Sequence, residues 1–206
     1  GGGVFSAGAR AQMQRFAERF RIPVVTTMMG LGLMPSSHPL YLGMLGSFGC
    51  SAANYAIHHS DLLILIGTRA GDRAMRQPGV LERQTRIIHI DIDPAEIRKN
   101  MEANIPLVAD ARLVLEELCE TCQATDTGMW LAELREKQGV GAPFSDRPSF
   151  VNPHRLIAAL TKALDSDAVY VADVGLNQIW SARSANIKDG RFLTSGGMGT
   201  MGYALP

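Results

Sequence analysis

Two arginines stand close together after a short apolar run, in a stretch that could bind an anionic ligand. The stretch reads Gly67-Thr68-Arg69-Ala70-Gly71-Asp72-Arg73 and follows the apolar residues 62–66. A guanidinium group presents several N–H donors in one plane, so Arg69 and Arg73 suit the oxygens of a diphosphate. Asp91 ends a second apolar run, where dinucleotide-binding folds place the carboxylate that accepts hydrogen bonds from ribose hydroxyls.

In the first 123 residues, small or polar residues lie repeatedly at the ends of the runs that resemble strands. Taken singly, a glycine there is usually a turn and an aspartate usually caps a helix. The G-x-G-x-x-G fingerprint is not met, because the glycine after Gly3 is Gly8. Taken together, the positions favour a nucleotide-shaped ligand over a set of unrelated turns. They are Gly1-Gly2-Gly3, Thr26 to Gly30, Gly43 to Gly46, Gly67 to Arg73, Asp91 and Asp110.

Other chemical signatures are missing from the sequence. The five histidines (38, 58, 59, 89 and 154) show no metal-ligand spacing, and there is no G-x-S-x-G elbow or Walker loop. Cys119 and Cys122 form a C-x-x-C without a second Cys or His pair nearby, so we interpret them as ordinary thiols at a helix end. We expect Cys50 to be a small buried residue.

Composition narrows the class of protein. The 206 residues are 46% hydrophobic and 19% charged, and 20 basic side chains balance 20 acidic ones. A net charge of zero argues against a nucleic-acid partner, and the longest apolar run, 62–66, is too short to cross a membrane. With three cysteines and no signal-peptide pattern, a reducing cytoplasmic location is expected.

Strand-like and helix-like stretches alternate in the first 123 residues. Short β-branched runs without strict alternation suit strands buried on both faces. We expect strands at 22–27, 61–67, 86–91 and 105–109, and helices at 9–20, 51–59, 94–100 and 111–120. Asp93-Pro94 has the residue types of a helix start. The predicted fold class is α/β, with a doubly wound, mostly parallel, Rossmann-like sheet in a central domain at 1–123.

A second α/β unit is expected after a linker. Residues 124–150 contain a short helix at 130–137 and then a Gly-, Pro- and Ser-rich stretch, which is typical of an interdomain linker. Residues 151–206 then predict the first part of a second α/β domain. Its helices are expected at 154–164 and 178–184 and its strands at 168–173 and 191–194.

Three stretches carry a resemblance to a known family. They are "GLGLMPSSHPLYLGMLGSFGCSAANYAIHHSDLLILIGTRAGDR", "IIHIDIDPAEI" and "LTSGGMGTMGYALP", and the resemblance extends from Gly1 to Pro206. The sequence resembles the large subunits of acetolactate synthases, which are thiamine-diphosphate-dependent enzymes. The resemblance implies the central, FAD-holding domain and the start of the diphosphate-binding domain. The family's activating glutamate and its magnesium ligands would then lie outside these residues, so the chain by itself would hold no catalytic residue and no metal ligand and would be inactive.

The resemblance also implies two sets of cofactor-binding residues. The FAD set departs from the family pattern at Ser47-Phe48, where Met-His is usual, and at Ala70-Gly71-Asp72-Arg73, where Phe-Asp-Asp-Arg is usual; some relatives bind ADP or no nucleotide here. In the thiamine set, Leu176-Asn177 replaces the usual Gln-His. The FAD set is Gly1, Gly2, Gly3, Thr27, Met28, Met29, Leu45, Gly46, Ser47, Phe48, Gly67, Thr68, Arg69, Arg73, Asp91, Ile92, Asp110, Ala111, Gln178, Ile179 and Gly196. The thiamine diphosphate set is Val174, Gly175, Leu176, Asn177, Gly199, Thr200 and Met201.

The resemblance implies a carboligase that decarboxylates pyruvate on thiamine diphosphate and joins the two-carbon unit to a second 2-oxo acid, in branched-chain amino-acid biosynthesis. Thiamine diphosphate, Mg²⁺ and FAD would be its cofactors, and 2-oxo acids its small-molecule partners. The full-length protein would be a homodimer or tetramer with a possible regulatory subunit. Two alternatives stay open: another thiamine-dependent enzyme, such as a glyoxylate carboligase or 2-oxo acid decarboxylase, and a nucleotide-binding module without catalysis.

Overall fold

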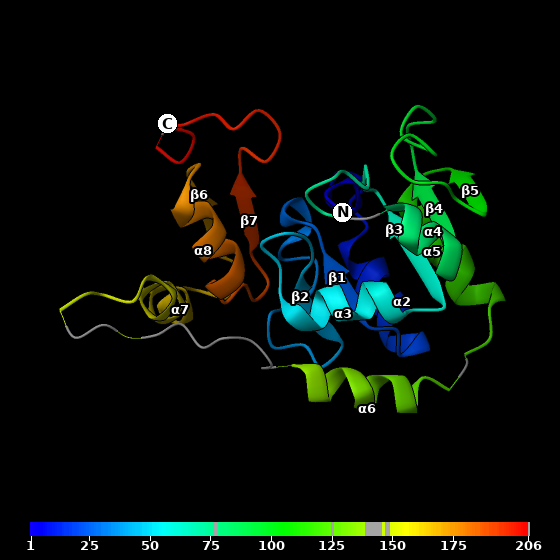
Figure 1. Ribbon diagram of the computed structural model, residues 1–206, viewed down its shortest axis with the longest axis horizontal. Coiled ribbons are helices and arrows are strands. Elements are labelled where there is room, and N and C mark those ends of the chain that lie inside the picture. The colour runs from blue at the N-terminus through cyan, green and yellow to red at the C-terminus, as the bar shows by residue number, and fades with distance from the viewer. Residues whose placement is uncertain (76–77, 125, 139–145, 147–148, 206) are drawn as a thin grey trace.

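The computed structural model describes residues 1–75, 78–124, 126–138, 146 and 149–205, and every strand pair in these ranges is parallel. The strands form three hydrogen-bonded groups, in the orders β1-β2, β3-β4-β5 and β6-β7. The arrowheads of β4 and β7 both point towards the upper edge of Figure 1, and the loop after β7 runs along that edge. The predicted α/β class with parallel strands is confirmed.

The first unit alternates helices and strands over most of its length. The apolar runs form β3 and β4 because their side chains are covered on both faces, and Ile64 stands opposite Ile88 in the register. The elements are α1 (Gly3–Ser6), α2 (Arg10–Phe20), β1 (Val24–Thr26), η1 (Met28–Gly30), β2 (Tyr41–Met44), α3 (Ser51–His59), β3 (Leu62–Ile66), α4 (Pro78–Gln84), β4 (Arg86–Asp91), β5 (Ile105–Val108), α5 (Ala111–Thr121) and α6 (Gly128–Lys137).

Helices cover both faces of this unit. One apolar cluster joins α2 and α5 to the strands through Phe16, Ile90 and Leu115. A second cluster joins α3 and α6 to the strands through Ile57 and Leu134, among others. Two separate cores, one on each face, are the packing of a doubly wound α/β unit.

Two expectations about the elements of the first unit were wrong. Residues 41–44 form strand β2, which pairs in parallel with β1, although the sequence predicted no strand there and gave 43–46 only as small residues at a candidate ligand site. Residues 94–100 contain only turns, because Arg98 adopts a left-handed φ of 62° and the Asp93 carboxylate accepts from the Ala95 N–H, an Asx-type turn. Helices α1 and α4 were not anticipated.

The second unit contains two strands and two helices. They are α7 (Pro153–Ala163), β6 (Val169–Ala172), α8 (Leu176–Ser184) and β7 (Arg191–Thr194). Asn152 caps α7 through its side-chain oxygen, which accepts from the backbone of His154 and Arg155. Ala172 stands opposite Thr194, so β6 and β7 end together. The loops that follow them therefore begin side by side.

Polar contacts hold the second unit against the first. The guanidinium of Arg10 in α2 donates to the backbone carbonyls of Lys188, Asp189 and Gly190, which precede β7. Ser36 donates its N–H to the carbonyl of Ile187 at 2.7 Å, and its hydroxyl accepts from the Ile187 N–H at 3.0 Å. These contacts of the segment 187–190, which precedes β7, thus fix how the second unit sits against the first.

The three cysteines are free thiols. Cys119 is buried at the end of α5 and Cys122 is exposed, and no three potential ligands among the described residues converge on a metal site. Cys50 is half-buried rather than buried, because it precedes α3 at the edge of the packed core. Across the described ranges, no helix is long and apolar enough to cross a membrane.

Candidate cofactor-binding sites

The glycine turn after β3 is the centre of the predicted nucleotide site. Gly67 has a left-handed φ of 53° and donates its N–H to the Ile90 carbonyl at 2.8 Å. Gly3 donates to the Gly67 carbonyl at 3.0 Å, and a Cβ on Gly3 would lie 2.7 Å from the Gly67 Cα. The N-terminal glycines therefore let two backbone segments pack closely, and their missing side chains face protein.

Two residues outside the predicted set orient the turn at 67–69. The ring of His89 is 1% exposed, and its Nε2 donates to the Thr68 carbonyl at 2.9 Å. The side-chain amide of Asn100 donates to the Arg69 carbonyl at 2.7 Å. Both carbonyls are turned towards protein, while the Arg69 side chain is exposed. A sequence signal for His89 was available, because His89 is the one polar residue in the otherwise apolar run Ile87 to Ile90.

The predicted residues around Ser47 and Arg73 come from two loops that lie together. The Ser47 N–H donates to the Arg73 carbonyl at 3.0 Å. Asn54 holds the Gly46 peptide from both sides, since its side chain accepts from the Gly46 N–H at 2.8 Å and donates to the Gly46 carbonyl at 3.0 Å. Within the described ranges neither Arg69 nor Arg73 forms an ion pair with a carboxylate. The exposed arginines therefore fit an anionic group such as a diphosphate.

The predicted acidic positions follow β4 and β5. Ala109 donates its N–H to the Asp91 carbonyl at 3.0 Å, so the two strand ends are adjacent. Asp110 caps α5, since its Oδ1 accepts from the N–H groups of Arg112 and Leu113. Asp91 Oδ1 accepts from the Asp93 N–H at 3.1 Å. Ile92 is exposed and Ala111 is buried.

Met29 connects the first unit to the glycine-rich loop of the second. A Cβ on Gly2 would lie 3.0 Å from the Met29 Cβ, and a Cβ on Gly196 would lie 2.5 Å from the Met29 Sδ. The N–H of Leu45 donates to the carbonyl of Thr26 at 2.9 Å, just before Thr27 and Met28. The structure thus brings Gly196 next to the predicted FAD residues that follow β1 and β3.

The predicted flavin-ring residues lie on α8. Gln178 donates to the Thr194 hydroxyl at 2.5 Å, which ties α8 to the end of β7. Gln178 and Ile179 are half-buried. No hydrogen bond among the described residues joins either of them to the nucleotide set of the first unit.

The predicted thiamine residues 174–177 form the start of α8. Gly175 precedes the helix with a φ of 127°, and a Cβ there would meet nothing within 4 Å. No side chain caps the helix. Leu176 is 62% exposed, and Asn177 is exposed as well. Uncapped N–H groups at the positive end of a nine-residue helix, with open space before them, fit a diphosphate.

The other thiamine residues lie in the loop after β7. Gly199 has a φ of 62° and open space at its Cβ position. Thr200 donates its N–H to the Ser195 hydroxyl at 2.9 Å, and Met201 is 80% exposed. The Asp173 carboxylate accepts from the Gly202 N–H. Asp173 was not among the predicted site residues, although its position at the end of the strand predicted at 168–173 could have pointed to it.

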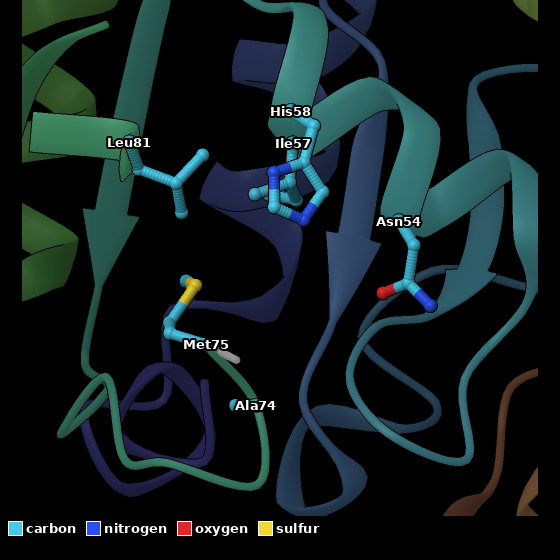
Figure 2. A pocket seen from close by; sticks show the side chains of 6 residues that line it. All are labelled: Asn54, Ile57, His58, Ala74, Met75 and Leu81. Carbon is cyan, nitrogen blue, oxygen red and sulfur yellow. The ribbon is translucent and has the colours of Figure 1, made fainter. Parts of the chain in front are cut away.

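Two cavities lie apart from most of these residues. One of about 260 Å³ opens between α3 and the segment before α4, and Figure 2 shows His58, Met75 and Leu81 around it. None of the predicted site residues lines this cavity. The other, of about 300 Å³, lies between β2 and α8, and Met44 and Ala182 are among the residues that line it.

The fold places the first unit in the class of parallel α/β domains, whose ligands bind at the carboxyl ends of strands. Residues 1–118 match the family described as "Thiamine pyrophosphate enzyme, central domain". The chain belongs to this family of thiamine-pyrophosphate-dependent enzymes.

Curated relatives match the chain over its whole length. It is 42% identical to a probable acetolactate synthase large subunit of Methanocaldococcus jannaschii and covers 37% of that protein. It is 42% identical to the acetolactate synthase large subunit of Corynebacterium glutamicum, covering 34% of it. It is 37% identical to the acetolactate synthase isozyme 1 large subunit of Escherichia coli, again covering 37%. The chain thus spans about a third of the length of these relatives.

Proposed function

We propose that this chain belongs to a longer protein with acetolactate synthase activity, in which pyruvate is decarboxylated and its two-carbon unit is joined to a second 2-oxo acid. The observation that carries this proposal is the match of the entire chain, at about 40% identity, to acetolactate synthase large subunits from archaea and bacteria. We further propose 1–123 as the central domain, 124–150 as the linker, whose helix α6 packs against that domain, and 151–206 as the opening of the thiamine-binding domain.

Thiamine diphosphate would be held by the start of α8 and the loop after β7. The uncapped N–H groups after Gly175 would bind its diphosphate, and Asn177 would add a polar side chain. Residues Gly199 to Met201 would support the cofactor's pyrimidine ring, with Met201 as the bulky side chain. When bound, the cofactor would supply a carbon nucleophile for the 2-oxo group and a cationic ring that accepts the electron pair left behind by departing carbon dioxide.

FAD would occupy the strand-end loops of the first unit. Arg69 and Arg73 would bind its diphosphate, Asp91 its ribose, and Met29 and Gly196 would border it where the two units meet. The reaction has no net redox step, so the flavin would be structural. Magnesium would bind through residues of the longer protein, since no three potential ligands come together among the residues that the structure describes.

A second thiamine-dependent activity is the alternative, and Leu176 favours it. This residue is 62% exposed at the helix start where the family usually has a polar side chain. Leucine cannot donate a hydrogen bond, so the backbone, Asn177 and the metal would hold the diphosphate. Such a change at the cofactor fits a glyoxylate carboligase or a 2-oxo acid decarboxylase.

The assembly proposed for the full-length protein follows the relatives. Several are named large subunits, which favours assembly with a smaller regulatory subunit, and we propose a homodimer or tetramer of the full-length protein. We propose a cytoplasmic location, as expected for a biosynthetic enzyme.

The function is tested by supplying the purified full-length protein with thiamine diphosphate, Mg²⁺ and either pyruvate, glyoxylate or benzoylformate. Acetolactate from pyruvate supports the proposal. Carboligation of glyoxylate alone, or release of an aldehyde, supports the alternative. A visible absorbance scan of the same sample tests the flavin, since a colourless protein that retains ADP would contradict FAD.

A further inference from the structure

One carboxylate bonds the backbone of both segments that we assign to thiamine diphosphate. Asp173 directly follows β6, and its Oδ1 accepts from the Val174 N–H at 2.7 Å. The same side chain reaches the other segment, because its Oδ1 and Oδ2 accept from the Gly202 N–H at 2.9 and 3.0 Å. Val174 begins the turn into α8, and Gly202 follows Met201. Asp173 therefore connects the two segments.

The loop after β7 has few other fixed points. Its Thr200 N–H bonds to Ser195 within the loop, and the Gly196 N–H bonds to the Thr194 carbonyl at its base. Met198 and Met201 are almost fully exposed. Among the described residues, Asp173 contributes the one side chain outside the loop that accepts a hydrogen bond from it. The place of Gly199 to Met201 beside α8 thus depends on this carboxylate.

We propose that Asp173 is a positioning residue for thiamine diphosphate, which sets the loop at 199–202 beside the start of α8 before the cofactor binds. This inference rests on the proposed function. Hydrogen bonds from backbone N–H groups to a carboxylate are stronger than those to neutral acceptors. A loop already held in place loses less conformational freedom when the cofactor binds, so affinity rises.

The negative charge of Asp173 has an opposing effect on a diphosphate nearby. Simple repulsion would weaken cofactor binding, and removing the charge would then improve it. Both carboxylate oxygens, however, already accept from N–H groups, and the residue lies near the positive end of α8. Positioning is therefore expected to outweigh repulsion. Asp173→Asn separates the two effects because it removes the charge and keeps one oxygen acceptor.

The test titrates thiamine diphosphate, with saturating Mg²⁺, into the cofactor-free full-length protein and its variants by isothermal calorimetry. We expect Asp173→Ala to raise the Kd by roughly 10- to 100-fold, the range for a lost hydrogen bond to a charged group. Asp173→Asn should fall between Ala and wild type. Asp167→Ala is the matched control, since this exposed aspartate precedes β6 at its other end and should leave the Kd unchanged.

A second measurement tests the hydrogen bond between Asp173 and the Gly202 N–H in the cofactor-free protein. Amide hydrogen exchange at Gly202 should become faster in Asp173→Ala than in wild type, and the thermal unfolding midpoint of both variants shows whether the fold is retained. A wild-type Kd in Asp173→Ala, tighter binding by Asp173→Asn, or unchanged exchange at Gly202 would each overturn the inference. Failure of the wild-type protein itself to bind thiamine diphosphate would overturn the proposed function, and this inference with it.

Discussion

Gly196 lies directly against Met29, so the glycine-rich loop of the second unit meets the end of β1 in the first. A Cβ at position 196 would lie 2.5 Å from the Met29 Sδ, which is closer than the two atoms can stand. The contact joins residues that are far apart in the sequence. It also places a loop of the second unit at the edge of the proposed flavin site.

Gly196→Ala should lower the free energy of unfolding by roughly 1 kcal/mol, because the added methyl displaces the flexible Met29 side chain. Urea denaturation measures the change. Gly197→Ala is the control, since a Cβ there meets nothing within 4 Å. Adding Gly196→Ala to Met29→Ala should cause little further loss of stability, because the side chain that the methyl would displace is then absent. An equal loss in the 196 and 197 variants would contradict the contact.

Arg10→Ala should destabilise the contact between the two units. The guanidinium donates to the carbonyls of Lys188, Asp189 and Gly190, and hydrogen bonds to a charged group contribute about 1.5–3 kcal/mol. We expect a lower urea midpoint, and a larger loss than in Arg15→Ala, an exposed arginine on the same helix. Identical midpoints for the two variants would remove Arg10 from the interface.

His154 should make stability fall in mildly acidic solution. Burial, and secondly the nearby Arg183 cation, lower the pKa of His154 from its ordinary value of 6.5. The folded chain therefore favours the neutral ring, and below pH 6.5 the unfolded chain binds the proton more readily. Unfolding midpoints should decline as the pH falls through this window, and less steeply in His154→Gln. A slope as steep in His154→Gln as in the wild type would contradict this role of His154.

Arg69→Ala should reduce the flavin content of the purified full-length protein several-fold. Its side chain is exposed at the strand end and forms no ion pair within the described part of the chain, so its charge is available to a diphosphate. The ratio of absorbance at flavin and protein wavelengths measures the content. Arg135→Ala, an exposed arginine on α6, should retain full flavin. Unchanged content in Arg69→Ala would remove this residue from the site.

Local patterns were enough to predict most of the helices and strands. The runs at β3 and β4 were recognisable because strands buried on both faces are apolar throughout. Strand β2 was missed because four residues with a glycine at φ 100° carry little local signal, and the strand exists through its pairing with β1. The helix predicted at 94–100 failed because its capping signal leads into mostly exposed residues without an apolar stripe to bury.

The sequence predicted that the candidate site residues lie at strand ends, but it did not predict how each residue contacts the rest of the chain. Strand ends indicated where Gly3 and Gly67 would lie, yet only the structure shows that their α-carbons pack against each other. Gly175 and Gly199, by contrast, face open space. His89 and Asp173 were missed because their roles are hydrogen bonds to backbone groups distant in the sequence or across a loop.

The most direct test measures the products that the purified full-length protein forms from pyruvate, with and without added thiamine diphosphate and Mg²⁺. The proposed activity predicts that acetolactate and carbon dioxide form in equal amounts, and only with the cofactor present. Carbon dioxide with acetaldehyde in place of acetolactate, or no reaction of pyruvate under conditions where glyoxylate is consumed, would contradict it.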